Sequence, residues 1–337
     1  MGLSLRRLPP WTGALAALLL MSVVTACIDP SFLRAVNLVN IVKNNSAAGI
    51  VATGMTLVIL LGGIDLSVGA LLAFAGGLGI AAMKALVDSG TSQGLACLAG
   101  ALATLALGTA AGALNGLLVA RGRLAPFIAT LGSLVAYRSA ATWIARGGQF
   151  FCNIPAFAAA GRGLPIPGTN IARAGTRVIP LEAPYVAIAW LLVVLAALFL
   201  VHRMRLGRYI VAVGSNERAA VYAAVPVRLV KFAAYTILGA LTGLAAFLHG
   251  AQYTSINSAN SGLNLELDAI AAVVIGGTRM EGGRGSLVGT VVGVLLLGVI
   301  RNMMVMLGVN TYAQGLVQGV IIVAAVLFQR VGRSPAR

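Results

Sequence analysis

Long apolar segments follow one another along almost the whole chain, and short stretches between them hold most of the polar residues. A helix that crosses a membrane needs about 20 consecutive apolar residues. The pattern therefore predicts an all-α bundle of about ten membrane-spanning helices. The expected spans are Trp11 to Ala26, Val36 to Leu61, a third ending near Met83, Gly94 to Val119, a fifth beginning at Pro126, Tyr185 to Val201, a seventh ending near Leu248, Leu265 to Gly277, a ninth containing Gly285 to Gly293, and Tyr312 to Phe328.

The stretch 201–231 is the most polar interruption between two apolar segments. Its charged residues are mostly cations: Arg203, Arg205, Arg208, Arg218, Arg228 and Lys231 against Glu217. Short basic loops between spans stay in the cytoplasm, so this stretch is predicted to be cytoplasmic. Residues 216–224 are expected to form a short helix, capped by Ser215 or Asn216 and ended by Pro226. The helix either projects toward a partner or belongs to an ordinary connecting loop.

A second interruption, Gly62–Gly69, reads G-G-I-D-L-S-V-G and places Asp65 between two apolar runs. It predicts either a helix that is broken inside the membrane or a turn at the surface in which Asp65 caps a helix. Irregular backbone at membrane depth is tolerated only where protein or a water-filled cavity satisfies it. An acid inside the membrane indicates a functional group. Asp65 would therefore be functional in the broken helix and only a helix cap in the surface turn.

Glycines recur at every fourth position in two of the apolar segments, namely Gly108, Gly112 and Gly116, and Gly285, Gly289 and Gly293. This spacing places each set on one face of a helix. Small residues on such a face let two membrane helices approach closely. We therefore expect both sets to be helix-packing faces.

The distribution of positive charge orients the predicted spans. Most of the 24 Lys and Arg residues fall in every second loop and at the two ends, which predicts cytoplasmic termini and an even number of spans. The stretches 146–184 and 252–264 are then expected outside the cytoplasm. Glu266 and Asp268 would lie at the outer end of the span that follows.

The first 28 residues resemble a signal peptide, because Arg6 and Arg7 precede an apolar run. Val24–Cys27 also resembles a lipoprotein cleavage site. The alternative is an uncleaved first span with a cytoplasmic N-terminus, and we prefer it because the segments that follow are also embedded in the membrane.

Composition agrees with a membrane protein. Of 337 residues, 59% are hydrophobic and 9% are charged, whereas soluble domains carry about 25% charged residues. The net charge of +16 does not indicate a nucleic-acid partner, because the cations lie in short loops rather than on one soluble face. The cysteines, Cys27, Cys97 and Cys152, are too few and too scattered for a disulfide framework or a metal site.

Several catalytic chemistries lack their motifs. The chain has no G-x-x-x-x-G-K-[S/T] phosphate loop, and neither His202 nor His249 has a second metal ligand at useful spacing. Gly90–Gly94 matches the G-x-S-x-G nucleophile pattern, but it lies in a loop between spans instead of a strand–turn–helix. The sequence therefore indicates a conduit rather than an enzyme, with no cofactor and no metal.

Four motifs in order together resemble a known family. They are Gly62–Gly69, Pro126–Gly132, a set made of Gly207, Arg208, Gly214, Asn216, Ala219 and Ala220, and Glu266–Thr278 followed by Gly282 and Gly283. The chain resembles, over residues 36–328, the permease subunit of bacterial ABC sugar importers of the ribose, xylose and galactose type. The resemblance implies a bacterial inner-membrane protein that forms a path for a monosaccharide.

The same resemblance implies the partners of the protein. They are a second permease copy or paired permease, a separate cytoplasmic ATPase, a periplasmic sugar-binding protein and the surrounding lipid, without nucleic acid. The stretch 201–231 becomes the expected ATPase-docking element. Its expected coupling residues are Gly207, Arg208, Gly214, Asn216, Glu217, Arg218, Ala219 and Ala220. An ion-coupled secondary transporter that uses Asp65 and Asp268 is the alternative.

A monosaccharide carries hydroxyl groups and no charge, so amides, hydroxyls and aromatic faces suffice along its path. The candidates for the path are Asn45, Asp65, Asn115, Phe127, Thr130, Asn302 and Gln318. The alternative is that the amides bridge helices, where such bonds contribute about 0.6 kcal/mol on average. We expect one permease domain over residues 1–337, with a first span and external turn at 1–35, a core at 36–328, the coupling loop at 201–231 and a cytoplasmic tail at 329–337.

Two positions depart from the family pattern. Ala223 and Ala224 stand where the family usually has Ser-Gly. Near the end of the ninth span the family usually has Asn-Gly, where this chain reads Arg301-Asn302-Met303-Met304. The first departure falls at the end of the predicted loop helix. The second falls on a membrane segment and bears on the identity of the substrate.

Overall fold

The computed structural model describes residues 9–172, 178–310, 313–317 and 319–320, and these residues form a mostly helical protein. The helices are α1 Thr12–Ile28, η2 Pro30–Leu33, α2 Ala35–Leu60, α3 Val68–Asp88, α4 Gln93–Ala120, α5 Pro126–Ile144, α6 Pro155–Ala160, α7 Tyr185–Arg203, α8 Arg205–Ser215, α9 Glu217–Tyr222, α10 Val227–Tyr253, α11 Leu265–Ile275 and α12 Leu287–Met306. The strands are β1 Gln149–Phe151, β2 Gly163–Ala172, β3 Val178–Pro184 and β4 Ser255–Asn257.

Within the described residues, five helices are long and apolar enough to cross a membrane, namely α3, α4, α7, α10 and α12. The protein is therefore a polytopic helical membrane protein. Helix α11 is shorter, and α2 carries several polar residues in its first half. Of the tenth predicted span, 312–328, the structure describes residues 313–317 and 319–320, which are helical, and the rest lies outside the described residues.

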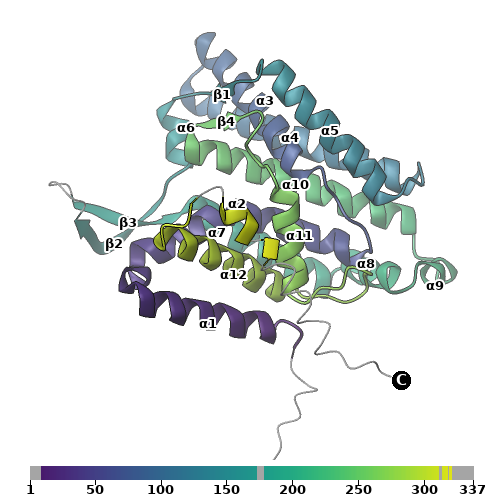
Figure 1. Ribbon diagram of the computed structural model, residues 1–337. Helices are drawn as coiled ribbons and strands as arrows, with labels where there is room; N and C mark the ends of the chain where they lie inside the picture. Colours follow the sequence, from purple (N-terminus) through teal and green to yellow (C-terminus); the bar gives the residue numbers. More distant parts are fainter. Residues whose placement is uncertain (1–8, 173–177, 311–312, 318, 321–337) are drawn as a thin grey trace, which may run out of the picture.

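The prediction of an all-α fold is wrong in detail, because two small antiparallel sheets are present. Strand β1 pairs with β4, with Phe150 opposite Ile256, and β2 pairs with β3. The stretch 146–184 is therefore not one irregular loop but holds β1, α6 and the β2–β3 hairpin. The hairpin lies at the end of the molecule opposite α8 and α9 (Figure 1).

Helix α2 lies at the centre of the packed core. Its second half, from Asn45 to Leu60, is buried on nearly every face. The residues Ile50, Val51 and Met55 are fully buried and belong to the largest apolar cluster, which also includes residues of α7, α10, α11 and α12. The helix runs between α12 and α10 (Figure 1). Helix α2 is therefore packed against α7, α10, α11 and α12.

Helices α4 and α10 pack backbone against backbone through glycine. A β-carbon on Gly108 would lie 2.7 Å from the Cα of Gly243, and one on Gly112 would lie 2.7 Å from the Cα of Gly239. Gly116 faces the backbone of Phe232 in the same way. The predicted packing face on α4 is confirmed. In the second predicted set, Gly289 lies against Gly276 and Gly293 against Ala272, whereas Gly285 precedes α12 and is not on its face.

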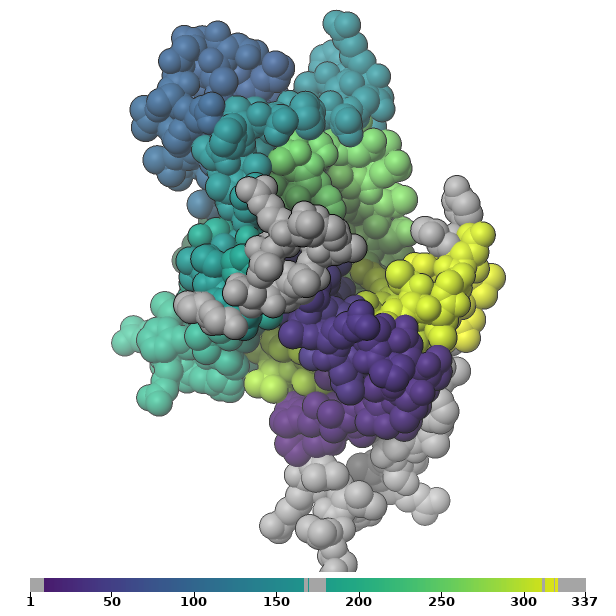
Figure 2. All heavy atoms as spheres, turned by 90° about the vertical axis from the view of Figure 1, so that its left-hand side faces the viewer, coloured from purple at the N-terminus to yellow at the C-terminus, as the bar shows by residue number. Residues whose placement is uncertain are grey.

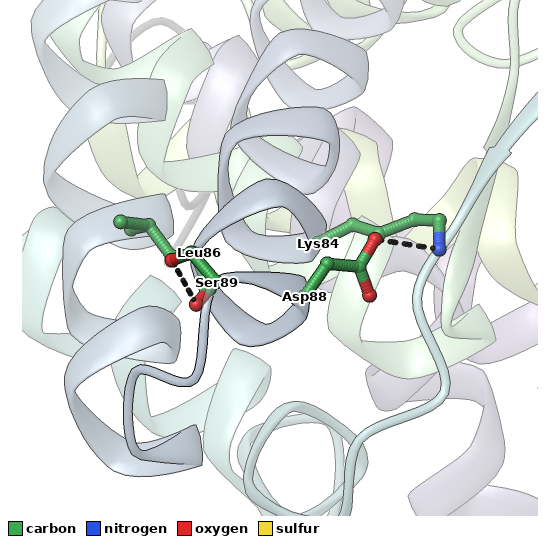
Figure 3. A network of polar contacts seen from close by, with 4 residues as sticks. All are labelled: Lys84, Leu86, Asp88 and Ser89. Atoms are coloured by element: carbon green, nitrogen blue, oxygen red, sulfur yellow. Dashed lines mark hydrogen bonds and ion pairs between the residues drawn. The ribbon is translucent and has the colours of Figure 1, made fainter.

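Helix α3 ends in a small polar group. Lys84 and Asp88 form an exposed ion pair at 3.2 Å, and the Oγ of Ser89 donates to the carbonyl of Leu86 at 2.8 Å (Figure 3). An exposed pair at this i, i+4 spacing contributes only about 0.3–0.5 kcal/mol. The group marks where the apolar helix meets water rather than what holds the helix together.

We predict that Gly112→Leu and Gly289→Leu destabilise the protein, because each new side chain meets backbone that cannot rotate away. Overpacking of this kind costs about 1–3 kcal/mol or more. Gly132→Leu on α5 is the control, since a β-carbon there meets nothing within 4 Å. Melting in detergent measures the effect. Equal melting temperatures for all three variants would contradict the packing role of these glycines.

Candidate functional site

The stretch 201–231 is not a loop but two consecutive helices, α8 and α9, held between α7 and α10. The prediction of a short helix is confirmed for α9, and Asn216 is its cap: the amide of Ala219 donates to Asn216 Oδ1 at 3.0 Å. Helix α8 was not predicted. Its polar face carries Arg205 and Arg208 toward solvent, while Ile210 and Val213 are buried.

Helix α9 ends at Tyr222, four residues before Pro226, so the proline does not end it directly. Ala224 adopts the left-handed conformation, with φ of 58°, and the amides of Ala224 and Val225 donate to Val221 and Ala220 at 3.0 Å each. This is the hydrogen-bond pattern in which glycine usually occupies the left-handed position. Alanine at that position costs roughly 1 kcal/mol relative to glycine. The departure from the family pattern at Ala224 therefore keeps the turn but strains it.

Helix α9 presents an exposed surface with an aromatic residue. Tyr222 is 91% exposed and Val221 is 58% exposed, and Arg218 is exposed beside them. Ala220 alone of this helix is buried. The helix is tied to α10 because Lys231 Nζ contacts both carboxylate oxygens of Glu217, at 2.7 and 2.9 Å. The sequence did not single out Val221 and Tyr222 as coupling residues. Their exposure is evident only once the buried face of α9 is known.

A cavity of about 380 Å³ lies between α9, the turn after α4 and the start of α10. Its lining is basic and includes Arg123, Arg228 and Lys231, together with the apolar side chains of Leu124 and Val221. The exposed Tyr222 directly follows Val221 in the chain. The cavity and the exposed face of α9 together form what we call the basic end of the molecule.

The backbone carbonyl of Leu60, at the end of α2, joins the basic end to the core. The amide of Gly283 donates to this carbonyl at 2.8 Å. Gly214 of α8 lies against the same carbonyl, and its β-carbon position is 2.7 Å from the amide nitrogen of Gly283. Gly207 in turn packs against the end of α7 at Val201. The predicted residues Gly207 and Gly214 thus serve close packing, whereas Arg208 and Arg218 face solvent.

Asp65 is inside the protein, 2% exposed, in the segment between α2 and α3. The amide and hydroxyl of Ser67 donate to its Oδ1 at 2.8 and 2.6 Å. Asn115 of α4 donates to its Oδ2 at 3.2 Å and to the hydroxyl of Ser67 at 2.9 Å. Ser133 of α5 donates to Asn115 Oδ1 at 2.6 Å. Asp65 is therefore a buried group in the segment between α2 and α3 and not a cap at the surface.

The remaining path candidates bond to separate partners. Asn45 donates to the carbonyl of Ile41 at 2.7 Å, and Thr130 donates to that of Pro126 at 2.8 Å. The side chains of Asn302 and Asn37 exchange two hydrogen bonds, at 2.8 and 3.1 Å. The side chain of Phe127 is 55% exposed. Gln318 lies outside the described residues.

Of the predicted path residues, these contacts bring together Asp65 and Asn115. Their hydrogen bonds link the 61–67 segment to α4 and α5, which is the helix-bridging alternative. Asn302 likewise bridges α12 to α2. The assignment of these residues to a substrate path stays a prediction.

Comparison with known proteins identifies the protein family. Residues 37–326 match the family described as the permease component of the branched-chain amino acid transport system. The chain belongs to this family of ABC importer permeases, multi-pass proteins of the bacterial inner membrane that do not carry the ATPase themselves. Family membership decides against the ion-coupled secondary transporter.

Individual relatives are similar along nearly their full length. The chain is 38% identical over 318 residues to the ribose import permease protein RbsC of Escherichia coli strain K12, covering 93% of this chain and 92% of the relative. It is 36% identical over 332 residues to RbsC of Bacillus subtilis strain 168, covering 97% and 93%. It is 35% identical over 303 residues to the D-allose transport system permease protein AlsC of Escherichia coli strain K12, covering 89% and 85%.

We predict that Asn115→Leu lowers the stability of the protein. The change leaves the buried Oδ2 of Asp65 without its donor, which costs about 1–3 kcal/mol, while Ser133 keeps its bond to the carbonyl of Ala129. Thr109→Val, on the same helix, is the control, because the Thr109 hydroxyl bonds only its own helix. Melting in detergent and solute uptake are measured together. A variant that keeps its melting temperature and loses uptake would contradict the bridging role and favour the path.

Proposed function

We propose that this protein forms the membrane path of an ABC importer for a monosaccharide of the ribose type. The main support for this proposal is the 38% identity, over 93% of the chain, to a protein that is named as a ribose import permease. A relative named for D-allose supports the same class of solute. A periplasmic binding protein delivers the sugar, and a cytoplasmic ATPase subunit supplies the energy.

We infer ten spans and cytoplasmic termini. The stretches that were expected inside meet in space, which supports the orientation. Arg123 and Lys231 line one cavity, Gly283 bonds to Leu60, and Gly277 lies against Pro10 near the N-terminus. Lys and Arg are retained on the cytoplasmic side, so the basic end is the cytoplasmic end. The domain boundaries are those expected from the sequence, with 201–231 as the coupling element.

The basic end is the docking site for the ATPase. An exposed tyrosine on a short, capped helix is the kind of anchor that dominates binding at protein interfaces. The Glu217–Lys231 pair fixes the helix in position, so little ordering cost arises on docking. Movement of α9 passes to α8, and from Gly214 to Leu60 at the end of the central helix α2. This chain of contacts is the proposed coupling route.

The apolar outer faces of the helices support lipid contact and pairing with a second permease. Leu98 and Leu102 of α4 and Leu191 and Leu195 of α7 are each more than half exposed. Such side chains are stable only against lipid or another protein. We propose that a second permease, identical or related, covers part of this surface.

Uptake by the reconstituted importer tests the proposed function. Proteoliposomes that hold this permease and its ATPase receive the loaded binding protein outside and ATP inside. We expect accumulation of labelled ribose that requires ATP and the binding protein. Labelled leucine is the control, because the family description names branched-chain amino acids. Uptake of leucine without ribose, or uptake driven by an ion gradient alone, would contradict the proposal.

We predict that Tyr222→Ala weakens ATPase binding by about 2 kcal/mol or more, as for an interface anchor, which is roughly thirtyfold in Kd. Trp143→Ala is the matched control, since Trp143 is 82% exposed and lies at the far end of α5. Affinity is measured with both variants in nanodiscs. Wild-type affinity in Tyr222→Ala would remove α9 from the docking surface.

A further inference from the structure

The segment 255–264, between α10 and α11, packs along α3 instead of forming the simple external loop expected for 252–264. The side chain of Ile256 packs against Gly76 in the middle of α3, and Gly262 lies against Gly69 in the first turn of α3. The segment therefore runs along the first half of a helix that is long and apolar enough to cross the membrane. It re-enters the molecule to membrane depth, and α11 starts there instead of at the surface.

Protein groups hold this re-entrant segment in an irregular conformation. Arg138, in the interior of α5, donates from Nη1 to the carbonyls of Ser258 and Ser261 at 3.0 and 2.8 Å. Asn257 Oδ1 accepts from the amides of Ala259 and Asn260 at 3.0 and 2.8 Å. The preceding residues pair with β1. Irregular backbone at membrane depth is stable only where hydrogen bonds satisfy its polar groups, and here the protein supplies them.

The tip of the segment nevertheless presents free polar side chains. Asn260 and Asn264 are exposed, and within the part of the chain that the structure describes neither amide side chain has a hydrogen-bond partner. Asn264 adopts a left-handed conformation with φ of 61° before α11. The light-green residues around α10 and β4 reach the molecular surface (Figure 2). Exposed irregular backbone with free amides is not stable against hydrocarbon, so this surface faces water.

We propose that the re-entrant segment 257–264 lines the water-filled translocation path, and that the amides of Asn260 and Asn264 bind the hydroxyl groups of the passing solute. The inference rests on the proposed sugar import. An amide both donates and accepts, which suits a neutral polyhydroxylated molecule. Among the nearby charges, Arg301 of α12 contacts Asp268 of α11. Arg138 is a positioning residue that acts through the backbone of Ser258 and Ser261.

Water accessibility tests the path without any transport. Cys27, Cys97 and Cys152 are replaced by Ser, and Asn260→Cys and Asn264→Cys are introduced singly into the full chain in nanodiscs. We expect both to react with a charged thiol reagent as readily as Ser89→Cys, which is exposed at the end of α3. Val135→Cys is the matched negative control, because Val135 is 56% exposed one turn before Arg138 on α5. Reaction at 260 and 264 as slow as at 135 would overturn the proposal.

Transport kinetics test the role of the amides. Asn264→Leu should reduce ribose uptake about five- to thirtyfold, the effect of losing one or two kcal/mol, while ATPase stimulation and melting temperature stay normal. Asn264→Gln keeps an amide and should restore most of the uptake. Arg138→Lys should retain more uptake than Arg138→Leu, because it keeps a donor for the carbonyls of Ser258 and Ser261. Equal uptake by Asn264→Leu and wild type would overturn the amide role.

The two proposals fail in different ways. If the wild-type importer takes up no ribose but the cysteines at 260 and 264 react, the path is confirmed and the sugar is wrong. If ribose is taken up and these cysteines do not react, the proposed function holds and the path lies elsewhere.

Discussion

Close approach of backbones at glycine is the interaction on which this structure depends. Lipid tails are as apolar as the side chains of the helices, so burial of leucine supplies little attraction between helices in a membrane. Van der Waals contact and hydrogen bonds remain, and both require that the helices come close. Along α4 and α10, Gly108, Gly112, Gly239 and Gly243 permit that approach over several turns. Any larger residue at these positions separates the two longest helices of the described chain.

Close approach of backbones at glycine also forms the junction between the basic end and the core. Gly214 and Gly283 come together at the carbonyl of Leu60, where α2 ends. Backbone contacts of this kind transmit displacement well, because they have no side-chain rotamers that absorb it. On the proposed coupling route, displacement of α9 reaches α2, which is packed against α7, α10, α11 and α12. The close packing of these backbones is therefore also what makes the junction rigid.

Much of this was predictable from local pattern. The apolar runs predicted the helices to within a few residues, the fourfold glycine spacing predicted the α4 packing face, and Asn216 followed by Glu217 predicted the capped helix α9. These features depend on neighbours in the chain. The re-entrant segment was missed, because polar residues such as Asn257 and Ser261 look like an external loop until the long-range contact with Arg138 is known. Helix α8 was missed because Arg205 and Arg208 make the stretch look like a polar loop, although Ile210 and Val213 form a buried face. Whether Asp65 was buried or at the surface depended likewise on Asn115, which is distant in sequence.

The central claim is that α9 is where the ATPase subunit engages this permease. Site-specific photo-crosslinking tests it most directly. A benzophenone amino acid replaces Tyr222 in one sample and Trp143, the exposed aromatic residue on α5, in the other. The account predicts that irradiation of the assembled importer joins the ATPase to the permease from position 222 and not from position 143. Crosslinking from 143 alone, or from neither position in an importer that hydrolyses ATP, would contradict it.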